Sequence, residues 1–216
     1  MDTRKILANL GCVLEGEFII ALKKAGVASK YVNIDPLLTR PDLLEEIARE
    51  IVASASLSSA IYPPTVVAGP AVGAIPLVYL VERVYHDFIP VIPRRKTVFA
   101  EKNKDGFVLD RLGFKEAVEG QSVWIVEDIG TTGDSAKQTG EAIVAAGGRI
   151  SGYSFIWNRG GVTNELMGAP VLSLINEAIE SWAPEEHPHW GKWPLVTDVG
   201  HPDKFPDYPG PRITLL

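Results

Sequence analysis

Short apolar runs alternate with segments of helical periodicity along most of the chain. Apolar runs bounded by turn residues are typical of buried strands. We expect strands over 31–34, 65–68, 90–92, 97–100, 123–126, 150–157 and 171–174. Apolar side chains at helical spacing predict helices over 41–55, 75–84 and 135–146, and a broken helical pattern over 4–25. This alternation predicts an α/β fold with a parallel sheet covered by helices on both faces.

Two segments have no regular period. Residues 101–114 are polar, and residues 183–211 are rich in Pro, His, Asp and Trp. A chain of 216 residues that is 46% hydrophobic can build one sizeable core. We therefore expect a single domain over 1–216, with a hood segment at 1–40, a core at 41–175 and an irregular tail at 176–216.

Polar and small residues with ligand-binding chemistry follow three of the expected strands, within 69–73, 127–135 and 158–161. Ligands of parallel sheets gather at the carboxyl ends of the strands. The three segments therefore predict one pocket at this edge of the sheet.

The segment after the strand at 123–126 combines two kinds of ligand-binding group. Glu127 and Asp128 are adjacent acids that can accept hydrogen bonds from sugar hydroxyls or hold a divalent cation. A loop of Gly and Thr follows, and a helix is expected after Gly133 with Asp134 or Ser135 as its cap. Loop amides and a helix N-terminus suit a phosphate. A sugar phosphate needs both halves, whereas an ordinary acidic turn is the alternative.

The segment 123–135 resembles the phosphoribosyl-pyrophosphate (PRPP) binding motif of the type I phosphoribosyltransferases. That motif has four apolar residues, two acids, two variable residues, Thr-Thr-Gly, one variable residue and then Ser or Thr, and every position fits. The resemblance implies the type I phosphoribosyltransferase fold, in which both terminal segments form a small hood. It also implies Mg²⁺ as a cofactor that is held mainly by PRPP and water. Glu127 and Asp128 would bind the ribose hydroxyls and act on the metal indirectly. The residues that would cradle the 5′-phosphate are Ile129, Gly130, Thr131, Thr132, Gly133, Asp134 and Ser135.

The first strand end matches a second loop of the resembled family. Small residues allow backbone amides to approach an anion closely. In the family this loop touches the pyrophosphate of PRPP, and Gly69, Ala71 and Gly73 fit its pattern. Ala74 stands where a second glycine is common. A tight turn kept for packing is the alternative.

Arg159 indicates which acceptor the resembled reaction would use. A guanidinium at a strand end suits a carboxylate. The segment resembles the orotate branch, in which the Arg of an Asp-Arg pair binds the carboxylate of orotate, and this implies that Arg159 and Thr131 fix the acceptor. This chain has Asn158 in place of the acid. A solvated surface arginine is the alternative.

The N-terminal segment supports the same branch. The stretches 16–20, 24–26 and 29–33 resemble the opening of the orotate phosphoribosyltransferases. A lysine of that opening reaches the substrates, which makes Lys24 the candidate and Lys23 the second choice. A solvated charge is the alternative for either lysine.

A basic segment at 94–104 resembles the loop that closes over PRPP, often from the neighbouring subunit. In the favoured register the chain matches a subgroup with a shorter loop, and Lys102, Lys104 and Arg111 are the closing, catalytic cations. In the other register Arg95 and Lys96 match an Arg-Lys pair, so they are secondary substrate-binding candidates. The histidine that is usual in this loop is absent.

The tail differs most from the family. His187 and His189 have a spacing that could bind a metal, but no cysteine or third ligand is near them in sequence. A surface tail packed by Trp190 and Trp193 is the preferred interpretation.

Composition bounds the partners of the protein. The formal net charge of −6 at pH 7 argues against a protein devoted to nucleic acid. Cys12 is the single cysteine, which excludes a disulfide framework and a cysteine metal site. No stretch approaches the roughly 18 apolar residues of a membrane span, and the N-terminus lacks the apolar region of a signal peptide. We therefore expect a cytoplasmic protein with no membrane partner and, from the resemblance alone, a homodimer.

The resemblance implies that the chain acts as an orotate phosphoribosyltransferase. Such an enzyme converts orotate and PRPP to orotidine 5′-phosphate and pyrophosphate in pyrimidine nucleotide synthesis. One alternative is a phosphoribosyltransferase for another nucleobase. The other is a non-catalytic sensor of PRPP or nucleotides, including one that binds RNA through residues 94–104.

Overall fold

The structure, a computed structural model, describes residues 2–22, 26–58, 61, 63–90 and 94–215. The chain divides into two compact units. The first consists of residues 1–6 and 34–178, and the second of residues 7–33 and 179–216. Helix α1 (Thr3–Asn9) crosses the boundary between them. The division into hood, core and tail at residues 40 and 175 stays a prediction.

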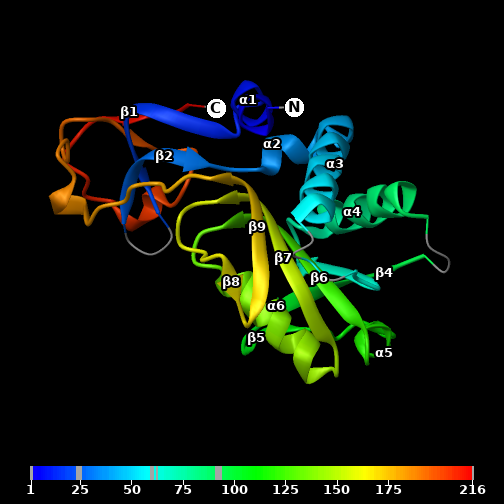
Figure 1. Ribbon diagram of the computed structural model, residues 1–216. Helices are drawn as coiled ribbons and strands as arrows, with labels where there is room; N and C mark the ends of the chain where they lie inside the picture. The colour runs from blue at the N-terminus through cyan, green and yellow to red at the C-terminus, as the bar shows by residue number, and fades with distance from the viewer. Residues whose placement is uncertain (1, 23–25, 59–60, 62, 91–93, 216) are drawn as a thin grey trace. The chain divides into compact units, whose positions relative to one another are not determined.

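A parallel sheet forms the centre of the first unit (Figure 1). Among the described residues its strands are, in spatial order, β5 (Gly106–Val108), β4 (Lys96–Asn103), β3 (Val66–Pro70), β6 (Ser122–Gly130), β7 (Arg149–Asn158), β9 (Ala169–Asn176) and β8 (Glu165–Leu166). The central strands pair in parallel, whereas β5 and β8 pair antiparallel at the two edges. The helices are α2 (Asp35–Leu38), α3 (Pro41–Ser58), α4 (Ile75–Phe88), α5 (Phe114–Val118) and α6 (Asp134–Ala145). The predicted α/β fold is therefore confirmed.

Helices cover both faces of this sheet. Val123 and Ile125 of β6 share a buried cluster with Ala136 of α6. The intervening Trp124 meets Tyr85 of α4 edge to face, with ring centroids 5.8 Å apart. Because successive side chains of a strand point to opposite faces, α6 and α4 cover opposite sides of the sheet. This double cover explains why the run at 123–126 is apolar at every position.

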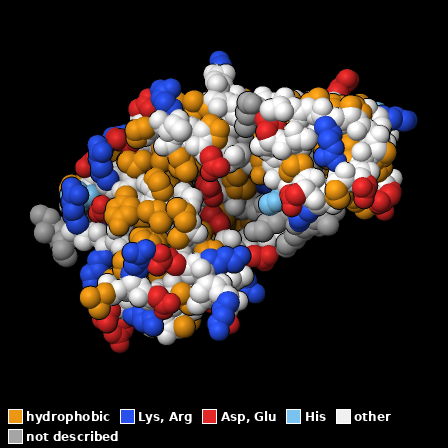
Figure 2. Space-filling view, turned by 180° about the vertical axis from the view of Figure 1, so that it is seen from behind, with side chains coloured by type: hydrophobic (Ala, Val, Ile, Leu, Met, Phe, Trp, Pro, Cys, Tyr) orange, Lys and Arg blue, Asp and Glu red, His pale blue; other side chains and the backbone are white. Residues whose placement is uncertain are grey.

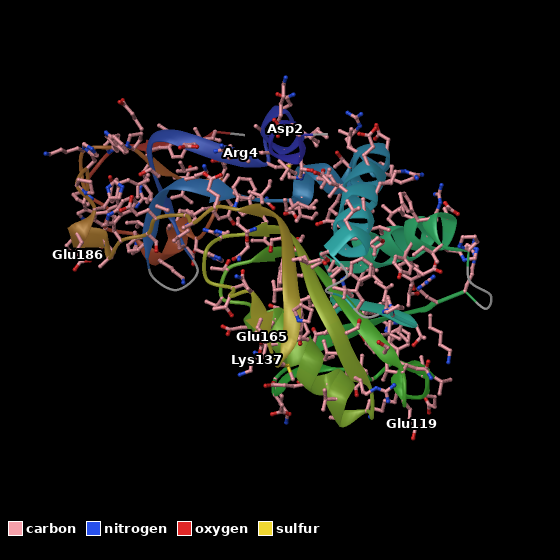
Figure 3. The ribbon with its side chains drawn as sticks, viewed as in Figure 1. Asp2, Arg4, Glu119, Lys137, Glu165 and Glu186 are labelled. Carbon is pink, nitrogen blue, oxygen red and sulfur yellow. The ribbon has the colours of Figure 1, made fainter. Side chains whose placement is uncertain are left out.

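The second unit joins the two ends of the chain in one small sheet (Figure 1). Its strands are, in spatial order, β11 (Arg212–Ile213), β10 (Leu195–Val196), β1 (Val13–Ala21) and β2 (Val27–Val32). β1 pairs antiparallel with β2 and parallel with β10. The short helices η1 (Pro184–Glu186), whose Glu186 is labelled in Figure 3, and η2 (Pro202–Lys204) lie in the tail.

The helical pattern expected over 4–25 is wrong after Asn9, because residues 13–21 form strand β1. The backbone of Ile19 donates to the carbonyl of Pro194 at 2.8 Å, and β2 pairs along the other edge of β1. The backbone hydrogen bonds of β1 are thus completed by β2 and by the far end of the chain, although local periodicity did not indicate a strand. The same pairing places β10 and β11 in a tail for which the sequence showed no regular period.

The other expected helices and strands are found with shifted ends, apart from the strand at 90–92, where residues 91 and 92 lie outside the described residues. In the tail, Trp190 and Trp193 pack with Ile19 and Leu195, which confirms the packing interpretation. Among the described residues, the structure contains no helix with the length and apolar character needed to cross a membrane.

Candidate active site

The three predicted strand ends belong to β3, β6 and β7, which are adjacent and parallel in the sheet. Their carboxyl ends therefore lie along one edge. The last residues of these strands and the loops that follow them contain residues 69–73, 127–135 and 158–161, so the structure brings together the three segments that the sequence singled out.

The acid pair lies at the end of β6, with its two carboxyl groups in different surroundings. Asp128 is partly exposed, and its Oδ1 accepts the backbone N–H of Ile129 at 2.8 Å. A Cβ atom placed on Gly73 would lie 3.1 Å from Asp128 Oδ2. A side chain at residue 73 would therefore crowd this carboxylate, which the loop after β3 approaches closely.

Glu127 is buried, with 7% of its surface exposed, and its Oε2 has no hydrogen-bond partner among the described residues. Burial, and secondarily the charge of Asp128, raises the pKa of Glu127 to about 8, while a hydrogen bond from the backbone of Ala136 acts in the opposite direction. Burial also raises the pKa of Asp128. A ligand hydroxyl or a cation would supply the partner that Glu127 Oε2 lacks, so the pair fits a sugar and a divalent ion.

The loop from Gly130 to Gly133 leads directly into α6. Gly133 caps the helix with a left-handed φ of 77°, and Thr132 Oγ1 accepts the backbone N–H of Asp134 at 3.4 Å. The expected cap at Asp134 or Ser135 is therefore wrong, because glycine takes the left-handed conformation that this entry requires. Lys137, which is labelled in Figure 3, follows in the first turn. Its Nζ lies 3.8 Å from Glu141 Oε1.

Chemically, this loop offers what a phosphate needs. Thr131 and Thr132 are exposed, whereas Ile129 and Ser135 are partly exposed. Helix α6 has 12 residues, so its first amides present an aligned N-terminus.

The loop that carries Arg159 lies directly against the phosphate-type loop. The backbone N–H of Arg159 donates to the carbonyl of Gly130 at 2.7 Å. A Cβ atom placed on Gly161 would lie 1.9 Å from the carbonyl oxygen of Thr131. Arg159 and Thr131, which the resemblance assigns to the acceptor, therefore come from two loops in contact.

The loop after β3 is held by its neighbours. A Cβ atom placed on Gly69 would lie 2.6 Å from the carbonyl oxygen of Val126, so residue 69 is required for close packing on β6. The backbone of Ala71 donates to the carbonyl of Ala100 at 2.7 Å, which ties the loop to β4. Both observations concern packing, and the role of this loop in binding pyrophosphate stays a prediction.

The predicted closing cations lie on and after the hairpin of β4 and β5. Lys102 and Lys104 are exposed. Arg111 forms a two-pronged ion pair with Glu101, with N–O distances of 2.7 and 2.9 Å. It is an exposed pair, of the kind that contributes little to stability, so Arg111 can exchange Glu101 for another anion at little cost.

Arg95 and Lys96 lie at the amino end of β4, about 20 Å along the strand from Lys102 at roughly 3.3 Å per residue. Arg95 Nε donates to the carbonyl of Pro64 at 3.0 Å, and its guanidinium lies 3.8 Å from the centre of the Tyr85 ring. Burial lowers the pKa of Arg95. The structure therefore does not place these two residues with the others in the same protomer. Lys23 and Lys24 lie outside the described residues.

Two residues at the site were missed by sequence reasoning. Val162 is buried and packs close to Gly130 and Gly133. Asn176 ends the neighbouring strand β9 opposite Asn158. Neither residue had a signal in the sequence, because both positions depend on which loops and strands become neighbours. Gly161, which makes the contact described above, lies within the segment 158–161 that the sequence indicated.

The histidines of the tail take part in packing. His187 Nε2 lies 3.1 Å from Ser29 Oγ, and its Nδ1 accepts the backbone N–H of His189 at 3.2 Å. The ring of His189 stacks on Trp193 with a centroid distance of 3.9 Å. Among the described residues, no set of three or more His, Cys, Asp or Glu is arranged to hold a metal ion.

Comparison with known proteins supports the arrangement. The chain is 34% identical over 188 residues to orotate phosphoribosyltransferase from Caldicellulosiruptor saccharolyticus, covering 87% of this chain and 90% of that protein. It is 31% identical over 191 residues to the enzyme of that name from Deinococcus radiodurans, covering 88% and 93%. No protein-family model matches the chain.

Solved structures agree in fold. The crystal structure of orotate phosphoribosyltransferase from Aeropyrum pernix superposes with a TM-score of 0.60 at 19% identity, covering 81% of this chain and 93% of that one. The Mycobacterium tuberculosis enzyme in complex with Fe(III) dicitrate also gives a TM-score of 0.60, at 21% identity and with 81% and 94% covered. Together with the sequence relatives, which extend over most of both chains, these likenesses show that the chain belongs to the orotate phosphoribosyltransferase family.

Proposed function

We propose that this protein transfers the 5-phosphoribosyl group of PRPP to orotate, giving orotidine 5′-phosphate and pyrophosphate. One observation carries the proposal. An acid pair and a phosphate-type loop follow one another at the end of β6, and an arginine loop leaves the neighbouring strand β7 and contacts the phosphate-type loop. A ligand that combines a sugar, a phosphate and a planar carboxylate acceptor matches these three elements.

The PRPP half of the site would use the carboxyl ends of β6 and of its neighbour β3. Glu127 and Asp128 would bind the ribose hydroxyls, and the loop from Ile129 to Ser135 would hold the 5′-phosphate with its amides and hydroxyls. The loop with Gly69, Ala71 and Gly73 would accept the pyrophosphate, since Gly73 lies next to Asp128. When bound with PRPP, Mg²⁺ would neutralise charge on the pyrophosphate, with Glu127 and Asp128 near it.

The acceptor half would use Arg159 and Thr131. A planar guanidinium can bind a carboxylate through two parallel hydrogen bonds and so orient the ring. Orotate is already a competent nucleophile when its ring nitrogen is deprotonated, so we assign no general base.

The reaction places two demands on the protein. The transition state has oxocarbenium character, and negative charge grows on the leaving pyrophosphate. Lys102, Lys104 and Arg111 would stabilise that charge when the hairpin closes. Closure would also exclude water, which would otherwise hydrolyse PRPP.

Purified protein with Mg²⁺, PRPP and orotate tests the proposal by loss of the orotate absorbance, with adenine, guanine, hypoxanthine, xanthine and uracil in parallel. We expect turnover of orotate alone. Turnover of another base would contradict the acceptor assignment and keep the PRPP site. PRPP binding without any turnover would favour a sensor. For a sensor that binds RNA one would expect a basic surface, whereas Figure 2 shows acidic and basic side chains mixed over the face in view.

Arg159→Ala tests the acceptor residue separately. We expect the KM for orotate to rise by about 10–100-fold, the loss typical of a charged hydrogen bond, while PRPP binding is retained. Arg149→Ala is the matched control, because Arg149 is exposed at the opposite end of the same strand. An unchanged KM for orotate in Arg159→Ala would show that the acceptor is bound elsewhere.

We further propose a cytoplasmic homodimer. The support is the family membership, in which the closing loop often acts across a subunit interface. Sedimentation of the purified protein measures the mass directly, and a monomer at the concentration of the assay would contradict the dimer.

A further inference from the structure

Asn158, the last residue of β7, is 6% exposed and uses both ends of its side-chain amide. Oδ1 accepts the backbone N–H groups of Gly160 at 3.0 Å and Val162 at 3.2 Å. Nδ2 donates to the carbonyl of Val162 at 2.7 Å and to Asn176 Oδ1 at 3.2 Å. A primary amide has two donor hydrogens and two acceptor lone pairs, so its capacity is filled.

These hydrogen bonds close the loop that carries Arg159. Gly160 and Val162, on the far side of Arg159 in sequence, are both held by the one side chain that precedes it. The backbone of Arg159 is fixed from the other side by the carbonyl of Gly130, at 2.7 Å. The base of the Arg159 side chain therefore has a position that Asn158 helps to set.

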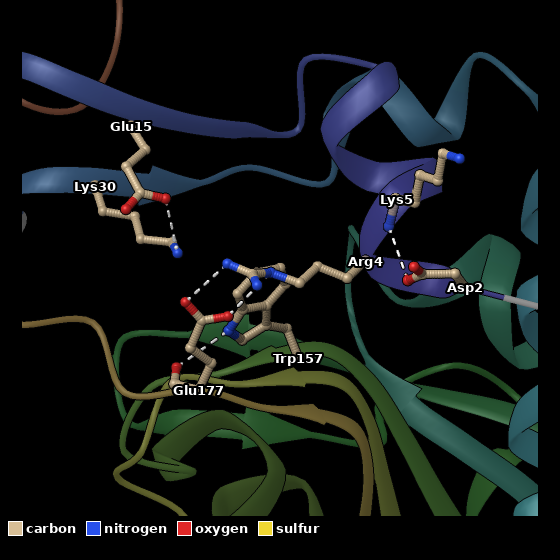
Figure 4. Close-up of polar contacts among 7 residues, drawn as sticks. All are labelled: Asp2, Arg4, Lys5, Glu15, Lys30, Trp157 and Glu177. Carbon is tan, nitrogen blue, oxygen red and sulfur yellow. Dashed lines mark hydrogen bonds and ion pairs between the residues drawn. The ribbon is translucent and has the colours of Figure 1, made fainter.

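The partner Asn176 is itself held in place. Asn158 and Asn176 face each other in the register of β7 and β9. The next residue, Glu177, donates its backbone N–H to the carbonyl of Asn158 at 3.0 Å and accepts Trp157 Nε1 at its own carbonyl at 3.2 Å. Its carboxylate pairs with Arg4 at 3.2 Å, as Figure 4 shows. Asn176 thus offers its oxygen from the end of an anchored strand.

This geometry requires an amide at residue 158. A carboxylate in its place could still accept the N–H groups of Gly160 and Val162. It could not donate, so it would face the carbonyl of Val162 at about 2.7 Å as a second acceptor. A protonated carboxyl group could restore one donor.

We propose that Asn158 is a positioning residue for acceptor recognition, which sets the Arg159 loop through its amide with Asn176 as its cross-strand partner. This inference rests on the proposed function. It accounts for the asparagine that stands where the resembled orotate branch has an acid, since in this chain the side chain must donate as well as accept.

Asn158→Asp tests the inference, with Asn164→Asp as the matched control because Asn164 is exposed a few residues further along the same connection. At pH 8 we expect the variant to raise the KM for orotate about tenfold or more, with the KM for PRPP changed less than about twofold. The ratio of the variant's KM for orotate to that of the wild type should fall as the pH is lowered to 5, because protonation returns a donor. The control should follow the wild type throughout.

Several results would overturn the inference. These are an unchanged KM for orotate, an equal rise in the KM for PRPP, or a ratio that does not depend on pH. If Asn158→Asp does not fold, Asn176→Ala gives the decision, with an expected rise of about two- to fivefold in the KM for orotate alone, and no rise would overturn it. A wild-type enzyme that does not turn over orotate refutes the proposed function first, whereas turnover with unaffected variants refutes only the role of Asn158.

Discussion

Close backbone approach at single residues shapes the candidate active site. Gly73 leaves room for the Asp128 carboxylate, Gly69 for the carbonyl of Val126 and Gly161 for the carbonyl of Thr131. Gly69 and Gly161 are required by the backbone oxygens that lie across from them, and a side chain at residue 73 would crowd Asp128. The site is therefore sensitive to small changes of side-chain volume at these positions.

Gly161→Ala should disturb both the fold and the acceptor loop. The added Cβ would lie 1.9 Å from the carbonyl oxygen of Thr131, so one loop must move. We expect a loss of about 1–3 kcal/mol in the free energy of unfolding, as for other overpacked sites, together with a higher KM for orotate. Urea denaturation and steady-state kinetics measure the two effects.

Gly168→Ala is the control for that variant. A Cβ atom there has no neighbour within 4 Å, although its φ of 76° disfavours alanine. The control should lose stability without a change in the KM for orotate. A Gly161→Ala enzyme with wild-type KM would show that the two loops are not rigidly coupled.

At the scale of elements, the tail is fastened to β2 by a buried histidine. His187 Nδ1 accepts a backbone N–H, so Nε2 carries the hydrogen and donates to Ser29 Oγ. Burial, and then the neighbouring His189, lowers the pKa of His187 in the folded protein. The folded state therefore prefers the neutral ring, whereas the unfolded chain takes up a proton near the ordinary pKa of about 6.5.

The sign of the pH dependence follows from that difference. The stabilisation from His187 is present above the unfolded pKa and is lost as the pH falls below about 6.5 towards the lowered folded value, with a slope of at most about 1.4 kcal/mol per pH unit. In His187→Gln this contribution is absent. The difference in melting temperature between the wild type and the variant should shrink from pH 8 to pH 5, with His201→Gln as the substitution control. A constant difference would contradict the assignment.

At the scale of the whole molecule, the positions of the closing cations bear on whether each active site is built from one subunit or from two. Lys102 and Lys104 lie on the β4–β5 hairpin, and Arg159 follows β7. If the hairpin serves the neighbouring subunit of a homodimer, each active site needs residues from two chains. A dimer of two different inactive chains can then contain one complete site.

Mixing tests this prediction. The variants Arg159→Ala and Lys102→Ala/Lys104→Ala should each have low activity alone. After exchange of subunits, about a quarter of the wild-type activity should return, since half of the dimers are hybrids with one intact site of two. Mixed Arg159→Ala and Arg159→Ala/Lys102→Ala chains are the control and should regain none. No recovery in the first mixture would assign the hairpin to its own subunit.

The local sequence pattern was enough to predict the central part of the candidate active site. The apolar run at 123–126, the acids that follow it and the Thr-Thr-Gly loop are contiguous, so their strand, loop and helix could be predicted from neighbours in sequence. The rule that parallel strands end at a common edge then placed residues 69–73 and 158–161 beside them. The α/β fold followed from the same alternation.

Only the tertiary structure decided the features that depend on distant partners. β1 is a strand because β2 and β10 complete its hydrogen bonds, and Arg95 is held by Pro64 and Tyr85 at the amino end of β4. The sequence showed that Asn158 departs from the family. One hydrogen bond that an amide at this position donates goes to Asn176, eighteen residues away on the adjacent strand. Periodicity in the sequence indicates which face of a helix or strand a residue lies on. The partner of its hydrogen-bonding groups, in contrast, depends on which strands become neighbours when the chain folds.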